Sequence, residues 1–239
     1  MCTVSFVPNR GSYYITSNRD EHISRPPAFE PKREVVNNMG LLFPKDPQAG
    51  GTWFAINELG HVGVVLNGAF EKHRSTANYR KSRGLVLLEV MSREMPFRYL
   101  QDTCLEGIEP FTLVLWENGS LLETRWDGNR KHSKSLSTLE GHIWSSVTLY
   151  DADAIHQRAS LFSDFMIENT EVRPEQVVDF HSNNHQDFEN GFIIDRKTGL
   201  KTFSVTQAVL DDTTSLRHFD LLNGKKSVVS FNTDQLTLH

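Results

Sequence analysis

MCTVSFVPNRGSYYITSNRDEH, residues Met1–His22, opens the chain and predicts a β-hairpin. The segment Thr3–Val7 is short, β-branched and aromatic, and turn residues separate it from a second β-rich run, Tyr13–Ser17. In a hairpin, the end of the returning strand lies beside the start of the outgoing strand. We therefore expect the charged segment Asn18–Glu21 to lie beside Cys2.

Two further hairpins are predicted by the same kinds of signal. The run GGTWFAINELGHVGVVLN alternates with period two, turns at ELG and ends at Asn67, before Gly68. Two strand-like runs also flank Asn118-Gly119, the preferred pair for a type I′ turn. The three prolines of HISRPPAFEPKREVV exclude a helix and predict an extended connection along a sheet edge.

Helical spacing of apolar residues occurs in the middle of the chain. Residues 84–104 fit two short helices with a break at Pro96. Asp151 and Asp153 are N-cap candidates for the longest helix, which we expect over Ala154–Ile167.

The last third of the chain contains a shorter helical segment, Pro174–Phe180, then the polar loop HSNNHQDFENG and more strands. The order of elements shows no repeated βαβ rhythm, so a doubly wound nucleotide-binding fold is not expected. The pattern favours an α+β fold of two antiparallel sheets with helices on their outer faces, formed by residues 1–239 as a single domain. The strands expected around and after the long helix are Ile143–Leu149, Gly191–Asp195, Leu200–Thr206, Leu216–Leu222 and Lys226–Phe231.

Composition narrows the function classes. The formal net charge of −5 disfavours a nucleic-acid binder, which concentrates Lys and Arg against phosphates. The basic cluster Asn129–Lys134 is interpreted as a solvated hairpin end. No window approaches the ~20 apolar residues of a membrane span, and the N-terminus lacks the pattern of a secretory signal, so we expect a cytoplasmic protein. Of the two cysteines, Cys104 is expected to be a small buried hydrophobic residue.

Cys2 has the properties of a candidate nucleophile. If Met1 is removed, Cys2 gains a free α-amino group, whose pKa of about 7.7 to 8.0 suits a general base. A neighbouring Arg19 would favour the thiolate, and Asp20 would orient the α-ammonium group. The alternative interpretations are an incidental cysteine at the start of a strand and a charged strand end exposed to water.

MCT followed by NRDE resembles the NRDE family, whose eukaryotic member is the transport-and-Golgi-organisation-2 protein, a branch of the N-terminal nucleophile (Ntn) hydrolases. The stretch GGTWFAINELGHVGVVLN is similar to the second block of that family. The resemblance covers the first third of the chain. It implies a four-layer αββα sandwich and kinship with penicillin V acylases and bile-salt hydrolases, which cleave a carbon–nitrogen bond in a linear amide.

The same resemblance implies roles for individual residues. Cys2, Arg19 and Asp20 match the catalytic positions of those enzymes, and Asn67 is the candidate donor to the oxyanion, with a turn residue as its alternative role. Ser145 and Ser146 stand where a further asparagine donor is expected, so the oxyanion site departs from the pattern. The residues expected to bind substrate are Asn18, Trp53 and Ser145.

The leading hypothesis is therefore a cysteine Ntn amidohydrolase that cleaves a non-peptide amide bond in a small acyl-amide substrate. The alternative is a non-catalytic NRDE-family protein in lipid or haem handling or trafficking. A third possibility is a redox-sensing thiol. The sequence predicts no cofactor and no metal site, because His181, His185 and Asp187 are interpreted as part of a solvated loop, and it indicates no oligomeric state.

Overall fold

The computed structural model describes residues 3–74, 79–231 and 233–238, and within them it contains two seven-stranded antiparallel sheets. The first sheet consists, in spatial order, of β10 (His142–Ser145), β1 (Thr3–Asn9), β2 (Ser12–His22), β11 (Leu200–Leu210), β12 (Ser215–Asp220), β13 (Lys225–Ser230) and β14 (Thr233–Leu238). The second sheet consists of β3 (Phe29–Val36), β4 (Met39–Lys45), β5 (Phe54–Asn57), β6 (Val62–Asn67), β7 (Phe111–Glu117), β8 (Ser120–Trp126) and β9 (Lys131–Leu136).

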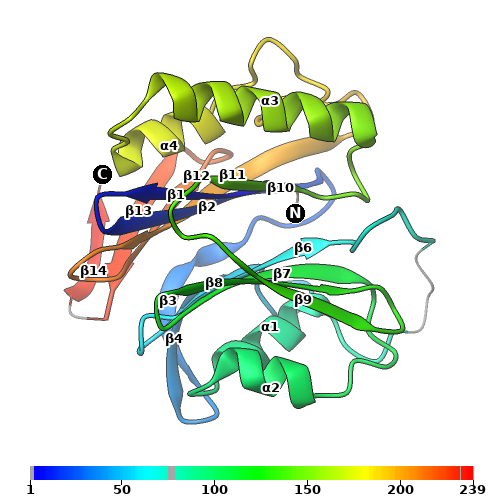
Figure 1. Ribbon diagram of the computed structural model, residues 1–239, viewed down its shortest axis with the longest axis vertical. Helices are drawn as coiled ribbons and strands as arrows, with labels where there is room; N and C mark the ends of the chain where they lie inside the picture. Colours follow the sequence, from blue (N-terminus) through cyan, green and yellow to red (C-terminus); the bar gives the residue numbers. More distant parts are fainter. Residues whose placement is uncertain (1–2, 75–78, 232, 239) are drawn as a thin grey trace.

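The helices lie on the outer faces of the two sheets. Helices α3 (Ala152–Glu168) and α4 (Pro174–His181) cover the first sheet, and α1 (Arg83–Met91) and α2 (Pro96–Asp102) cover the second (Figure 1). This arrangement confirms the predicted α+β fold, a four-layer αββα sandwich. A large cluster of buried apolar side chains includes residues of both sheets and of α1, so burial of apolar surface holds the layers together.

Local signals in the sequence set the helix ends. The Ser82 side chain accepts a hydrogen bond from the N–H of Leu85 and caps α1, and Asp151 caps α3 by accepting from the N–H of Ala154. Proline occupies the first turn of both α2 and α4. Backbone N–H groups in the first turn make no hydrogen bond within the helix, so proline, which lacks an N–H, costs no helical hydrogen bond there. The predicted long helix is confirmed, with Asp151 rather than Asp153 as its cap. No helix in the described part of the chain is both long enough and apolar enough to cross a membrane.

Some predicted strands are wrong in extent or in kind. The strand expected over Ile143–Leu149 ends at Ser145, and Gly191–Asp195 is a loop in which only Asp195 forms an isolated bridge. Loop packing explains the latter: Phe192 and Ile194 are buried beneath the helical layer, which gives the segment the alternation of a strand. The unpredicted strands are β4, which is buried on both faces and so does not alternate, the exposed strand β9, which overlaps the basic cluster, and β14 at the edge of the first sheet.

Two single-residue predictions are also wrong. Cys104 is exposed, because it follows the end of α2 in a turn at the surface. His181 is fully buried rather than part of a solvated loop, because α4 extends one residue beyond Phe180 and turns this side chain toward the first sheet.

Candidate functional site

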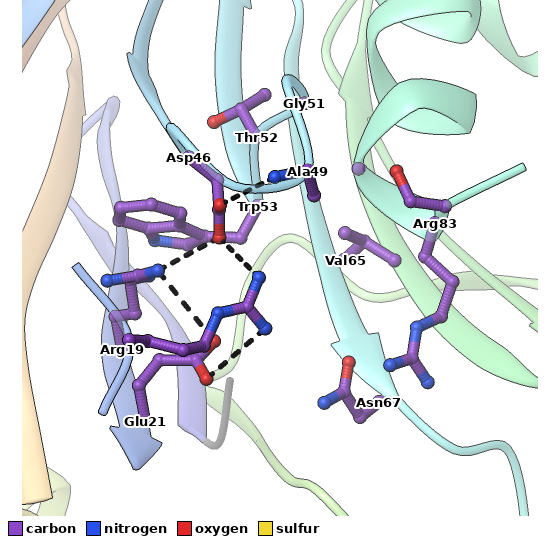
Figure 2. A pocket seen from close by; sticks show the side chains of 13 residues that line it. Arg19, Glu21, Asp46, Ala49, Gly51, Thr52, Trp53, Val65, Asn67 and Arg83 are labelled. Atoms are coloured by element: carbon purple, nitrogen blue, oxygen red, sulfur yellow. Dashed lines mark hydrogen bonds and ion pairs between the residues drawn. The ribbon is translucent and has the colours of Figure 1, made fainter. Parts of the chain in front are cut away.

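A cavity of about 110 Å³ opens where the end of β2, the loop after β4, the end of β6 and the start of α1 meet (Figure 2). We call it the arginine pocket, because three arginines belong to its lining. The residues that line it are Arg19, Glu21, Arg25, Asp46, Ala49, Gly51, Thr52, Trp53, Val65, Asn67, Ser82, Arg83 and Gly84. It thus contains Arg19, Trp53 and Asn67 of the predicted site and brings them together.

Arg19 lies in the interior of the molecule and is held from two sides. Its Nη2 donates to Oδ2 of Asp46 at 2.9 Å, and its guanidinium carbon lies 4.8 Å from the centroid of the Trp53 ring. Arg19 is only 1% exposed, and its Nη1 is buried without a hydrogen-bond partner among the described residues. The side chain is therefore a fixed, charged donor with unused capacity.

Asp46 connects two of the arginines. Arg25 also donates to Oδ2 of Asp46, at 2.9 Å, while Oδ1 accepts from the backbone N–H groups of Gln48 and Ala49. Burial alone would raise the pKa of Asp46, but the N–H of Ala49 and the charges of Arg25 and Arg19 outweigh it and hold the pKa below its ordinary value. Asp46 is thus a carboxylate at neutral pH and neutralises part of the positive charge.

The NRDE segment divides between the two faces of β2. Arg19 and Glu21 line the arginine pocket, whereas the side chains of Asn18 and Asp20 contact the helical side of the first sheet. This follows from the period of two in a strand, because successive side chains point to opposite faces. Asn18, predicted to bind substrate, and Asp20, predicted to be catalytic, are therefore not brought into the pocket with Arg19.

On the helical side, Asn18 and His181 form a buried pair. Nδ2 of Asn18 donates to the carbonyls of His181 and Phe192, and its Oδ1 bonds to Nδ1 of His181. Nε2 of His181 bonds to the hydroxyl of Ser5 at 2.7 Å. Burial, with a smaller contribution from the positive charge of Arg158, lowers the pKa of His181 to about 3, so the ring is neutral at pH 7.

Asp20 is buried on the same face. Its Oδ1 accepts from the Thr202 hydroxyl at 2.6 Å and its Oδ2 from the Tyr150 hydroxyl at 2.9 Å. Arg158 stacks on Tyr150 and donates to the Thr3 hydroxyl and to the carbonyls of the 190–191 loop. These contacts fix the N-terminal end of β1 against the helical layer.

Asn67 ends β6 at a tight backbone contact. Gly68 has φ +82°, and a Cβ there would lie 2.6 Å from Cγ2 of Val147. The Ser146 hydroxyl donates to the carbonyl of Asn67 at 2.8 Å. Figure 2 shows no hydrogen bond between the Asn67 side-chain amide and the other residues around the arginine pocket.

Ser145 lies in an adjoining cavity of about 120 Å³, which Asn67 also lines. In β10, Ser145 pairs with Thr3, and on the other side of β1 Thr3 pairs with Asn18. Cys2, the predicted nucleophile, lies outside the described residues. Thr3 is therefore the nearest described residue to it along the chain.

Sequence reasoning did not single out Asp46 or Arg83. Asp46 stands before a proline in a turn signal, which indicates local capping but not its contact with Arg19. Nη2 of Arg83 forms an ion pair with Oε2 of Glu109 at 3.1 Å, and Nη1 donates to the carbonyl of Pro110. The described residues contain no group of three or more His, Cys, Asp or Glu side chains that could hold a metal ion.

The family model for Transport and Golgi organisation 2 matches residues 1–218 of the chain. No curated protein sequence matches it. Among solved structures, the fold is similar to that of a cysteine-to-alanine variant of the conjugated bile acid hydrolase from Clostridium perfringens, with a TM-score of 0.61, 11% identity and coverage of 100% of this chain and 97% of that one.

Two further structures share the fold. Penicillin V acylase from Agrobacterium tumefaciens has a TM-score of 0.56 at 9% identity, over 98% of this chain and 87% of that one. The Caenorhabditis elegans ortholog of N-acylethanolamine-hydrolyzing acid amidase has a TM-score of 0.61 at 10% identity, over 86% and 92%. These structures are Ntn hydrolases, and at such low identity the likeness shows the fold alone.

Proposed function

The chain belongs to the Transport and Golgi organisation 2 family, and from this membership and the geometry of the arginine pocket we propose that it is an Ntn amidohydrolase. In this proposal Cys2 is the nucleophile, and the substrate is a small acyl amide. Arg19 favours the thiolate, and Asn67 donates to the oxyanion.

The observation that carries the proposal is the register of β1 and β2. Thr3 pairs with Asn18, so Arg19 is the next residue of β2 in the direction in which β1 continues toward Cys2. Consecutive Cα atoms are 3.8 Å apart, so covalent geometry alone keeps Cys2 within a few ångströms of this strand end. In the proposal, the Arg19 guanidinium, whose Nη1 has no partner among the described residues, favours the Cys2 thiolate.

The proposed reaction requires that Met1 be absent. The α-amino group of Cys2 takes the thiol proton, and the thiolate attacks the amide carbon to form a sulfur–carbon bond. The carbonyl oxygen becomes an oxyanion, to which the Asn67 side chain donates. When the carbon–nitrogen bond breaks, the amine leaves with the proton of the α-ammonium group, and water then hydrolyses the thioester to release the acid and restore the thiol.

Asp20 remains the proposed partner of the α-ammonium group. Hydrogen bonds from Tyr150 and Thr202 fix the orientation of its carboxylate. Trp53 and Ser145 are proposed to act near the substrate, and Asn18 is proposed to act through the strand that carries Arg19. Trp53 supports Arg19, Asn18 anchors the strand, and Ser145 lines the cavity beside Asn67.

The names of the similar structures support the choice of reaction. They are a hydrolase of conjugated bile acids, an acylase of penicillin V and an amidase that hydrolyses N-acylethanolamines. The variants of the bile acid hydrolase replace a cysteine by alanine and an arginine by leucine, the two residue types proposed here at positions 2 and 19.

The direct test combines intact mass with hydrolysis of an acyl-amide panel. We expect purified protein to lack Met1 and to cleave an amide, and Cys2→Ala to lower kcat/KM by at least about 10³-fold. Cys104→Ala is the matched control, because that thiol is exposed and far along the chain, and it should retain wild-type activity. Quantitative retention of Met1, or equal activity of Cys2→Ala, contradicts the proposal. A processed terminus without amide cleavage would instead support the non-catalytic alternative in lipid or haem handling.

A further inference from the structure

A trough with a mainly apolar lining, to which Glu71, Lys72 and Asp151 also belong, adjoins the cavity beside Asn67. The trough has a volume of about 500 Å³, within the usual range of ligand sites, and its apolar lining includes Phe70, Val147, Leu149 and Ile155. Val147 and Ile155 also line the 120 Å³ cavity, which in turn shares Asn67 with the arginine pocket. The three spaces are therefore neighbours, and the 120 Å³ cavity lies between the arginine pocket and the trough.

The trough exposes apolar surface that folding would ordinarily bury. Phe70 is 50% exposed, and the guanidinium of Arg125 lies 5.1 Å from the centroid of its ring. An apolar chain lying along Val147 and Ile155 would remove this surface from water, with a gain in affinity of about fourfold for each buried methylene.

The arginine pocket has the opposite character. Its lining holds three guanidinium groups and the carboxylates of Glu21 and Asp46, and Glu109, which is not part of the lining, pairs with Arg83. Nε of Arg25 is buried without a hydrogen-bond partner in the described part of the chain, as is Nη1 of Arg19. Arginine presents several N–H donors in a planar arrangement that matches a carboxylate. The pocket therefore offers unused guanidinium N–H donors to an anionic group.

From the polarity of the two ends we infer that the substrate is an N-acyl amino acid. Its acyl chain lies in the trough, its amide carbonyl lies at Asn67, and the carboxylate of its amino-acid half lies in the arginine pocket near Arg25 and Arg83. This inference rests on the proposed amidohydrolase function and names its substrate class. A neutral amide of the same chain length would leave the surplus donors of the pocket without an acceptor.

The test measures binding to Cys2→Ala by titration calorimetry, so that the result does not depend on turnover. N-decanoylglycine should bind at least about tenfold more tightly than N-decanoylglycinamide, which differs only in the charge of its carboxyl end. N-hexanoylglycine, four methylenes shorter, should bind about 100-fold or more weakly than N-decanoylglycine. Equal affinities for the glycine and glycinamide compounds, or affinity independent of chain length, would overturn the inference.

Two matched pairs of variants test which cavity binds the carboxylate of the substrate and which binds its acyl chain. In the Cys2→Ala background, Arg83→Gln should lower the preference for the glycine over the glycinamide compound at least fivefold, whereas Arg33→Gln, at an exposed arginine paired with Glu58, should leave it unchanged. Ile155→Trp should fill the trough and remove the preference for the longer chain, whereas Ile167→Trp, exposed on the same helix, should keep it. A ratio of affinities is the readout because a general loss of folding lowers both affinities together.

The binding test and the hydrolysis test can contradict the substrate class and the amidohydrolase function independently of each other. Wild-type cleavage of other amides, with no preference for the anionic compound, retains the amidohydrolase function and removes this substrate class. Tight, chain-length-dependent binding of N-decanoylglycine without cleavage by wild type retains the site and removes the reaction.

Discussion

Arg19 and Asp46 form an interior ion pair, with 2.9 Å between Nη2 and Oδ2, and the same oxygen accepts from Arg25. The pair links the first sheet to the loop after β4 in the second, across 27 residues of sequence. Stacking of the two sheets therefore fixes the position of the Arg19 guanidinium in the arginine pocket.

Asp46→Asn should destabilise the protein by about 2 to 4 kcal/mol, because it removes the nearest counter-charge of the buried Arg19 and leaves only Glu21, at 3.8 Å from Nη2, as its ion-pair partner in the described part of the chain. Urea unfolding at pH 7 measures the change. Glu30→Gln removes an exposed pair with Lys225 and should change the free energy of unfolding by less than about 0.5 kcal/mol. Because the pKa of Asp46 is lowered in the folded state, its contribution is present above the ordinary aspartate pKa of 3.8 and is lost as pH falls through the folded pKa. The difference between wild type and Asp46→Asn should therefore narrow below pH 3.8, and a constant difference would contradict the assignment.

The Asp20 carboxylate should depend on Tyr150 for its hydrogen bonding. Tyr150→Phe removes the donor to Oδ2 and leaves that oxygen buried, at an expected cost of about 1.5 to 3 kcal/mol in the free energy of unfolding. Tyr13→Phe is the control, because the Tyr13 ring packs on Phe6 and Trp116 and the substitution keeps that packing. Equal effects of the two substitutions would show that the Tyr150 hydroxyl does not support Asp20.

The hairpin of residues 3–22 and its pairing were predictable because turn chemistry and β-rich runs are local signals. The hairpin alone suggested that Asn18, Arg19 and Asp20 all face one site. Strand alternation, also readable from the sequence, divides them between the pocket and the helical layer. The expectation that the segment lies beside Cys2 stays a prediction, because Cys2 lies outside the described residues.

Other parts of the site depend on packing between distant segments, which no local pattern records. Asp46 meets Arg19 only because the two sheets stack, and Arg83 reaches the pocket only because the start of α1 packs closely on the loop after β4. A Cβ on Gly51 would lie 2.5 Å from the carbonyl carbon of Gly84, so two glycines permit this approach. The glycines were visible in the sequence, but their contact was not.

Gly68 should be required for the position of Asn67. Gly68→Ala places a Cβ 2.6 Å from Val147 in a backbone with φ +82°, so it combines conformational strain with a steric clash. We expect a loss of at least about 2 kcal/mol in unfolding free energy. Gly11→Ala, with φ +89° and no atom within 4 Å of the added Cβ, has the strain alone and should cost about 1 kcal/mol. If both variants lose the same stability, the contact between Gly68 and Val147 does not restrict the backbone.

Acid should destabilise the protein partly through its buried histidines. Burial lowers the pKa of His181 to about 3 and that of His218 to about 4, against an ordinary histidine pKa of 6.5. Between pH 6 and 4 the unfolded chain therefore binds protons at both positions that the folded chain does not. Each such proton lowers the free energy of unfolding by about 1.4 kcal/mol per pH unit. The stability is fully present above pH 6.5 and falls as the solution becomes more acidic.

His181→Gln removes one of the two side chains that bind a proton in the unfolded chain but not in the folded chain. The slope of unfolding free energy against pH should decrease by up to about 1.4 kcal/mol per pH unit between pH 6 and 4. The measurement is a series of urea unfolding curves at constant ionic strength. The slope, unlike the stability at one pH, does not depend on whether Gln reproduces the bonds of His181 to Asn18 and Ser5. A slope equal to that of wild type would mean that His181 is protonated in the folded protein, which is incompatible with its burial between the first sheet and α4.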